Sequence, residues 1–322
     1  MSAVATTAVQ SPPVAATLDR VAAKKVKRPM GVPFWLAVTW ITGVILSTTV
    51  VTLNHWKKEV DFLAGADVAA GNWTKTFSWA HPLGVDGAGN DTLWELTTGA
   101  KNSLIIAFTT VLLGFVIGGA LGMAAGYFRG RVDAVLSFFT TALLSLPPLL
   151  FIILLISVLS ASSGSADFGI EQGLQSSVMK VSLALAVLAT PSLFRVVRAS
   201  TIQYAQREFV TAARTMGAKP ARVLVREILP NVAKPLLAFG LVSAGGVMVI
   251  EGSLSFLGIG VGAGTGTSAW GKMIQEGASA QDLRTAPNIS LISALVLFLT
   301  VVSLNFIGDK FRERLEVKQG NI

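Results

Sequence analysis

Long apolar runs separated by polar segments organise this chain. Six runs contain no Asp, Glu, Lys or Arg, and they cover residues 29–56, 102–128, 134–166, 181–194, 235–250 and 286–308. A helix of about 20 apolar residues crosses the hydrocarbon core of a bilayer. Four of the runs exceed that length, and the fourth and fifth reach it with polar residues at their boundaries. The pattern predicts an all-α integral membrane protein with six transmembrane helices.

The composition agrees with a membrane protein. Only 14% of the residues are charged, against about 25% in soluble domains, and the mean hydropathy is +0.63. With the N-terminus in the cytoplasm, 19 of the 26 Lys and Arg residues fall on the cytoplasmic side, as the positive-inside rule requires. The net charge of +8 is therefore spread over the flanks of the spans. Nucleic-acid binding, which needs one basic patch, is not predicted.

This orientation divides the chain into segments. We expect a basic disordered cytoplasmic tail, an uncleaved first transmembrane helix, an extracytoplasmic segment, a core of five spans and a second cytoplasmic tail. Their boundaries are 1–30, 31–56, 57–101, 102–309 and 310–322. Both termini are then cytoplasmic. In the third span, Pro147 and Pro148 lack backbone donors, so we expect a kink there.

The polar segment between the fourth and fifth runs contains a short amphipathic helix. Apolar or small residues recur at Phe209, Ala212, Ala213 and Met216, the spacing of one helix face, and Gly217 ends the helix. A short helix with a small-residue face between two membrane spans has the shape of a docking element for a soluble partner. An ordinary amphipathic loop helix is the alternative.

The same segment resembles the EAA coupling loop of permease subunits in ATP-binding-cassette (ABC) importers. That loop has Glu-Ala-Ala, then Gly after three residues, then Leu-Pro twelve residues after the Gly. Residues at these positions here are Thr211 in place of the glutamate, Ala212, Ala213, Gly217, Leu229 and Pro230. The resemblance implies a cytoplasmic coupling loop at 199–230 that contacts an ATPase. The contact residues it implies are Glu208, Phe209, Thr211, Ala212, Ala213, Arg214, Met216, Gly217 and Pro230.

Residues 81–91 resemble a signature that precedes the second span in one subgroup, the C-type permeases of dipeptide and oligopeptide importers, with nickel-importer relatives. The signature reads His-Pro-Leu-Gly-Thr-Asp-x-x-Gly-Arg-Asp, and Val85 and Asn90 depart from it. Further segments match the family in the same order, so the resemblance covers roughly residues 80–315. These segments are 99–104, 125–130, 251–260, 268–271 and 305–309. The resemblance implies the type I ABC importer permease fold and uptake of short peptides.

The resemblance also implies partners and a location. It implies a homologous second permease subunit, one or two ATPase subunits that bind ATP and Mg, and an extracytoplasmic solute-binding protein, all at a bacterial plasma (inner) membrane. The chain has no Walker-type phosphate loop, so we expect a non-catalytic subunit without a cofactor of its own. His81, Asp86 and Asp91 are too weak a set to predict a metal site.

The translocation path is predicted to pass the outer half of the fifth span, at Ser243, Met248 and Glu251. For Met248, a place in the core is the alternative. An external loop at 252–285 is expected to face the binding protein through Gly258, Gly260 and Trp270.

Three other functions stay open at this stage. Import of nickel or another small solute would use the same machinery. A secondary transporter would need a charged residue at bilayer depth, and none of the six apolar runs contains one. A membrane scaffold or exporter-type subunit is the third.

Overall fold

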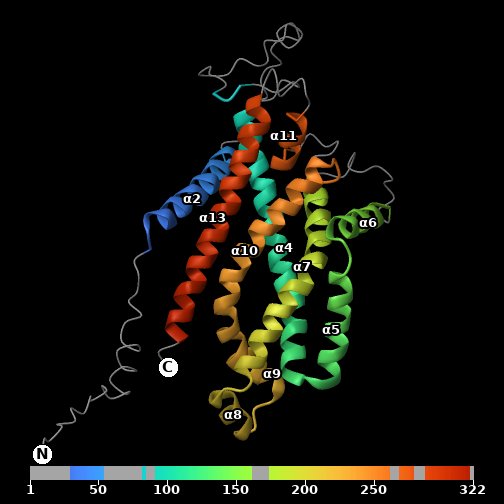
Figure 1. Ribbon diagram of the computed structural model, residues 1–322, viewed down its shortest axis with the longest axis vertical. Helices are drawn as coiled ribbons and strands as arrows, with labels where there is room; N and C mark the ends of the chain where they lie inside the picture. Colours follow the sequence, from blue (N-terminus) through green and yellow to red (C-terminus); the bar gives the residue numbers. More distant parts are fainter. Residues whose placement is uncertain are drawn as a thin grey trace, which may run out of the picture.

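The computed structural model describes residues 30–53, 82–84, 91–161, 174–261, 268–278 and 287–319, and every element within these ranges is helical (Figure 1). Several predictions lie outside the described residues. They concern the tail 1–29, the segment 54–81, the residues 85–90 with Val85, Asp86 and Asn90, the loop residues 262–267 and 279–286, His81, and the last residues 320–322.

Five single helices in the described part are long and apolar enough to cross a membrane. They are α2 (Val32–Leu53), α4 (Thr92–Phe128), α7 (Leu174–Tyr204), α10 (Leu229–Phe256) and α13 (Pro287–Gln319). The number rises to six, as predicted, if α5 (Gly130–Leu144) and α6 (Pro148–Ala161) form one broken span. The pair is bent by 96° at the expected prolines. Proline removes a backbone donor and crowds the preceding turn, which accounts for the break.

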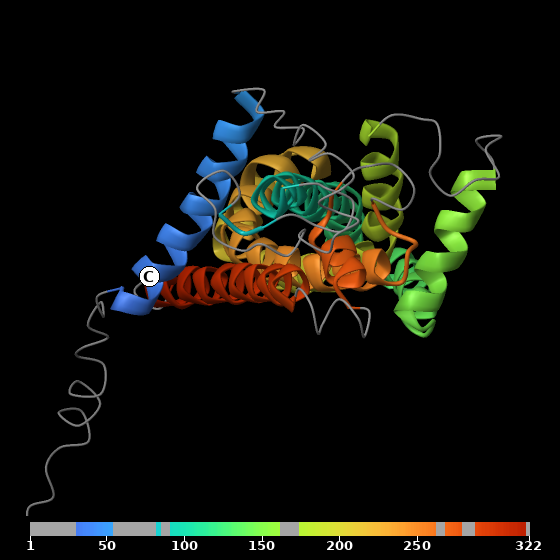
Figure 2. The ribbon, with the colours of Figure 1, turned by 90° about the horizontal axis from the view of Figure 1, so that it is seen from above.

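The helix α4 lies at the centre of the bundle. The helices α7, α10 and α13 surround it, α2 crosses the outside of α13 on one side, and α5 and α6 flank α7 on the other (Figures 1 and 2). The main cluster of buried apolar side chains fills the space between α4, α6, α7, α10 and the short helix α11 (Trp270–Glu276).

Glycines let α4 approach α7 closely. They recur at every fourth position of α4, at Gly114, Gly118, Gly122 and Gly126, and so lie along one face. A Cβ atom at Gly118 would lie 2.6 Å from the carbonyl oxygen of Thr190, and one at Gly122 would lie 2.7 Å from that of Phe194. Small residues at helix contacts in membranes allow this backbone-to-backbone packing. This glycine face was not among the features predicted from the sequence.

Three boundaries differ from the sequence prediction. The helix α4 begins at Thr92 rather than near residue 102, because Asp91 caps it: the amide of Trp94 donates to Asp91 Oδ1 over 3.0 Å. The last ten residues of the predicted segment 57–101 are therefore helical. The fifth span is longer than expected, since the helix runs without a break through 220–256. The predicted tail at 310–322 is helical as far as Gln319.

Candidate functional site

The short helix α8 (Glu208–Thr215) stands at one end of the bundle, beyond the ends of α4 and α7 (Figure 1). We call this end the α8 end, and the opposite one, where α11 lies, the α11 end. At the close of the helix, the amide of Gly217 donates to Arg214 over 2.9 Å, and Gly217 adopts a φ of +80°. Glycine enters this left-handed region without strain, so the predicted stop at Gly217 is confirmed.

One face of α8 is buried in the protein's own interior. Val210 is fully buried and Ala213 is 8% exposed, and both pack in a cluster with Val197 of α7, Val223 and Ile228. The last two belong to a π-helical turn, η2 (Val223–Ile228), that follows the three-residue helix α9 (Pro220–Arg222). The expectation that Ala213 faces a partner is therefore wrong, because the Val210–Ala213 pair is the face that meets the core.

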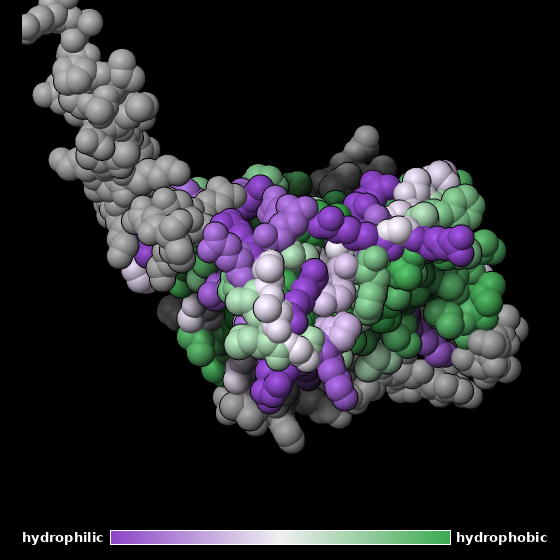
Figure 3. Space-filling model, turned by 90° about the horizontal axis from the view of Figure 1, so that it is seen from below, coloured by the Kyte–Doolittle hydropathy of each residue, from purple (hydrophilic) through white to green (hydrophobic). Residues whose placement is uncertain are grey.

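The neighbouring face of α8 is exposed. Phe209 is 39% exposed and Met216 is 81% exposed, and Ala212 between them is exposed as well. Glu208, Thr211, Arg214 and Gly217 are exposed too, as is Pro230 near the start of α10. Figure 3 looks onto this end, where hydrophilic residues gather with moderately hydrophobic ones among them. We define Phe209, Ala212 and Met216 as the outer face of α8.

A cation–π contact fastens α8 to the central helix. The guanidinium carbon of Arg214 lies 4.6 Å from the ring centroid of Tyr127, in the last turn of α4. Tyr127 also packs against the buried cluster beneath α8. A guanidinium group at this distance over an aromatic ring is attracted electrostatically by the ring face. The helix α8 is thus connected to α7 through the chain and to α4 through side chains.

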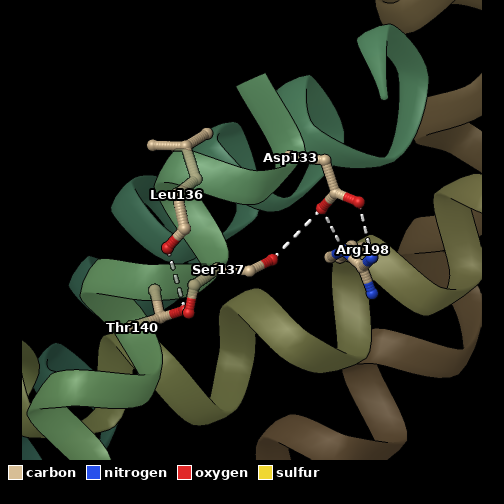
Figure 4. A network of polar contacts seen from close by, with 5 residues as sticks. All are labelled: Asp133, Leu136, Ser137, Thr140 and Arg198. Carbon is tan, nitrogen blue, oxygen red and sulfur yellow. Dashed lines mark hydrogen bonds and ion pairs between the residues drawn. The ribbon is translucent and has the colours of Figure 1, made fainter. Parts of the chain in front are cut away.

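An ion pair joins α5 to α7 near the same end (Figure 4). Arg198 of α7 donates from both Nε and Nη2 to the two carboxylate oxygens of Asp133, the second over 2.6 Å. Ser137 adds a hydrogen bond of 3.1 Å to Asp133 Oδ1. A bidentate pair fixes orientation as well as distance. The start of α5 is therefore held to α7 shortly before α7 leads into α8.

At the α11 end, a buried carboxylate joins α4 to α10. Glu251 is 0% exposed and accepts hydrogen bonds from Ser103 Oγ at 3.1 Å and from Ser255 Oγ at 2.7 Å. Met248, one turn earlier, is also fully buried in the core, and Ser243 is partly buried. The expectation that Met248 and Glu251 line an open path is not met in this structure, because both side chains are enclosed by this chain's own helices.

The segment that begins at Ser268 closes over the start of α4. Asn102 Nδ2 donates to the Ser268 carbonyl over 2.8 Å, Ser268 Oγ donates to Glu95 over 3.0 Å, and Trp270 Nε1 donates to the Leu96 carbonyl over 2.9 Å. Trp270 is fully buried, so the prediction that it faces a binding protein is wrong. Its indole is buried against α4, where its donor is satisfied by the Leu96 carbonyl.

The two glycines assigned to the same external loop are partly buried. Gly258 has a φ of +76°, and a Cβ atom at Gly260 would lie 2.1 Å from Ser255 Oγ. Both glycines are thus needed for a tight reversal after α10. Exposed apolar side chains nearby belong instead to Phe256 and Leu257, at 44% and 52%. These two residues were not predicted from the sequence, because the residues around them are apolar or small and uncharged as well.

The described residues contain no group of three or more His, Cys, Asp or Glu that could hold a metal ion. The described side chains instead connect the two ends of the bundle mechanically. An exposed helix at one end is locked to α4 and α7, and the far end of α4 is hydrogen-bonded to α10 and to the segment at Ser268.

The chain is similar in sequence to known transport proteins of membranes. The family model described as "Binding-protein-dependent transport system inner membrane component" matches residues 118–318. A glutathione transport system permease protein, GsiD, of Pectobacterium atrosepticum is 32% identical over 241 residues, which are 75% of this chain and 74% of the relative. GsiD of Escherichia coli O6:K15:H31 is 31% identical over 283 residues, which are 88% and 86% of the two chains.

A solved structure shares the fold. A chain of the MetNI methionine ABC transporter, in an inward-facing conformation, superposes with a TM-score of 0.54 at 19% identity. The superposition covers 69% of this chain and 97% of that chain. The predicted architecture, the type I ABC importer permease fold, is thereby confirmed.

Proposed function

The chain belongs to the family of binding-protein-dependent transport system inner membrane components and is a permease subunit of an ABC importer, and from this premise we propose that its cargo is short peptides or peptide-like solutes. The relatives named for glutathione support this, since glutathione is a peptide-like solute. The signature at residues 81–91 supports it as well, through its resemblance to dipeptide and oligopeptide permeases.

We further propose that the outer face of α8 binds a partner ATPase subunit. The observation that carries this proposal is the two-sided character of α8: Val210 and Ala213 hold one side in the core while Phe209, Ala212 and Met216 remain exposed. An apolar patch on a polar end of a molecule marks an interaction site. A second permease subunit and an extracytoplasmic binding protein complete the proposed assembly.

The proposed orientation puts the α8 end in the cytoplasm. The distribution of Lys and Arg supports this, because the exposed Arg207, Lys219, Arg222 and Arg226 surround α8. Both termini then lie on the cytoplasmic side, and the α11 end with Phe256 and Leu257 meets the binding protein.

In the proposed mechanism, α4 carries displacement from the ATPase side to the far side. The helix is continuous over 37 residues, about 55 Å at 1.5 Å per residue. Closure of the ATPases would move α8, and the Arg214–Tyr127 contact with the buried cluster would move α4 with it. The other end of α4 holds Ser103 against Glu251, so the contact between α4 and α10 would change. ATP would thereby shift the population between two access states. The permease itself catalyses no reaction in this scheme.

A growth experiment tests the cargo. A strain that lacks this gene and is auxotrophic for one amino acid receives that amino acid only as a dipeptide, a tripeptide or glutathione. We expect growth on at least one of these sources to depend on a plasmid copy of the gene. Free amino acid is the control and should support growth in every strain. Unchanged peptide use together with lost nickel uptake would overturn the peptide assignment.

A further inference from the structure

A groove of about 430 Å³ lies between α2 and the first turns of α4, near the α11 end. One face of α2 lines it, from Leu36 through Gly43 to Ser47, at the spacing of three and four residues that a single helix face has. The first two turns of α4 line the other side, and Trp270 and Val296 complete the wall. Its volume falls in the range of about 300–1,000 Å³ that small-molecule sites occupy.

The chemistry of the lining favours an apolar occupant. The described residues that line the groove include no charged side chain. Two of its three hydroxyl groups donate within the chain: Ser47 Oγ donates to the Val44 carbonyl over 2.8 Å, and Thr97 Oγ1 donates to the Trp94 carbonyl over 2.9 Å. Trp40 Nε1 donates to Thr300 Oγ1 over 3.1 Å, and the indole of Trp270 is already hydrogen-bonded to α4. Few donors remain for a polar ligand, whereas a hydrocarbon chain needs none.

Gly43 shows that the groove is open space rather than a packed interface. A Cβ atom added at Gly43 would meet no atom within 4 Å. The glycines of α4 that face α7 are the reverse case, since a Cβ there would collide with the neighbouring helix. The space beside Gly43 is therefore not filled by other atoms of this chain. An apolar void of this size leaves its walls without dispersion contacts on one side.

The rim of the groove is continuous with the lipid-facing surface. Leu36 is 66% exposed and Leu93 is 39% exposed, and the neighbouring Val32 and Trp35 of α2 are exposed as well. Both α2 and α4 are among the helices long and apolar enough to cross a membrane. The groove thus opens sideways, from within the bundle toward the apolar part of the bilayer.

We propose that this groove is a lipid site that holds one acyl chain of a membrane phospholipid between α2 and α4. The acyl chain fills the space beside Gly43 and contacts Trp40 and the apolar side chains of α2 and α4 that line the groove, while the headgroup stays outside it. The site is independent of the cargo and of the ATPase contact proposed above.

Photo-crosslinking tests the site in the full-length chain, purified with its co-expressed partner subunits. The complex is loaded with phosphatidylethanolamine that carries a diazirine in one acyl chain, washed in detergent to remove loosely held lipid, irradiated and digested. We expect crosslinked peptides from residues 36–47 and 93–100. A second sample loaded with a free diazirine fatty acid distinguishes phospholipid from free fatty acid, and equal labelling would reassign the occupant to the latter and overturn the proposal.

Gly43→Phe fills the groove without a clash and should lower the labelling about tenfold, equivalent to about 1.4 kcal/mol of binding. The matched control is Leu46→Phe, on a face of α2 that is 58% exposed and does not line the groove, and its labelling should stay at the wild-type level. Equal labelling of the two variants, or labelling confined to exposed positions such as Leu46, would mean that only surrounding lipid is present. Protein crosslinks from 36–47 to another segment or subunit would mean that protein fills the groove. Either result overturns the proposal.

Discussion

Close packing of α4 on α7 predicts opposite effects for two adjacent glycine substitutions. Gly118→Ala adds a methyl group whose carbon would lie 2.6 Å from the Thr190 carbonyl oxygen and 3.1 Å from the Phe194 amide nitrogen. Both atoms belong to the backbone of α7, so no side-chain rotation can relieve the overlap. Gly119→Ala adds the same group where no atom lies within 4 Å. The two variants therefore differ only in whether the new methyl group faces α7.

The expected magnitude follows from this comparison. Replacing glycine by alanine inside a helix gains up to about 1 kcal/mol of helix propensity, and both variants share that gain. Gly118→Ala also pushes two helices apart, and overpacking of this kind costs about 1–3 kcal/mol. The free energy of unfolding should therefore be about 1–3 kcal/mol lower for Gly118→Ala than for Gly119→Ala, while Gly119→Ala should equal or exceed wild type.

Unfolding by titration with sodium dodecyl sulfate, followed by far-ultraviolet circular dichroism in one detergent, gives the comparison directly. Gly122→Ala serves as a repeat, because its added carbon would lie 2.7 Å from the Phe194 carbonyl oxygen. If Gly118→Ala and Gly119→Ala unfold within about 0.5 kcal/mol of each other, a difference below the stated overpacking range, the close contact between α4 and α7 is refuted.

Three further predictions concern the α8 end. Ala212→Arg, on the exposed face of α8, should abolish substrate-stimulated ATPase activity in the assembled complex but leave gel-filtration behaviour unchanged. Ala213→Arg forces a charge into the buried cluster and should cause aggregation. Wild-type coupling in the Ala212→Arg variant would refute the docking surface. In a double-mutant cycle, Asp133→Asn and Arg198→Gln should show a coupling energy of about 0.5–2 kcal/mol, because the ion pair is partly exposed to solvent. Strictly additive effects on the free energy of unfolding would mean that the ion pair contributes nothing. The chain has no native cysteine, so the thiol introduced by Arg222→Cys can be labelled selectively. It should not react with a membrane-impermeant thiol reagent in intact cells but should react after lysis. Labelling in intact cells would reverse the proposed orientation.

Local features of the sequence were enough to predict the helical membrane architecture. Six uncharged apolar runs, the break at Pro147 and Pro148, and the stop at Gly217 all depend on chemistry within a few neighbouring residues. A proline lacks its donor, and a glycine can adopt a positive φ without strain, whatever surrounds them. The order of family motifs along the chain likewise needs no tertiary information, and the family match confirmed it.

Burial, by contrast, was decided only by the tertiary structure. Spacing along α8 placed Ala212 and Ala213 on one face, but which part of that face turns inward depends on where α7 and η2 return to pack against it. Trp270 was predicted to be an exposed loop residue, yet its indole donates to the Leu96 carbonyl, which is distant in sequence. Glu251 was predicted to line the path, yet its carboxylate accepts buried hydrogen bonds from Ser103 and Ser255. The periodicity of a helix sets the angle of each side chain around its own axis. The direction of the core is set by other helices, and a single-chain pattern does not contain it.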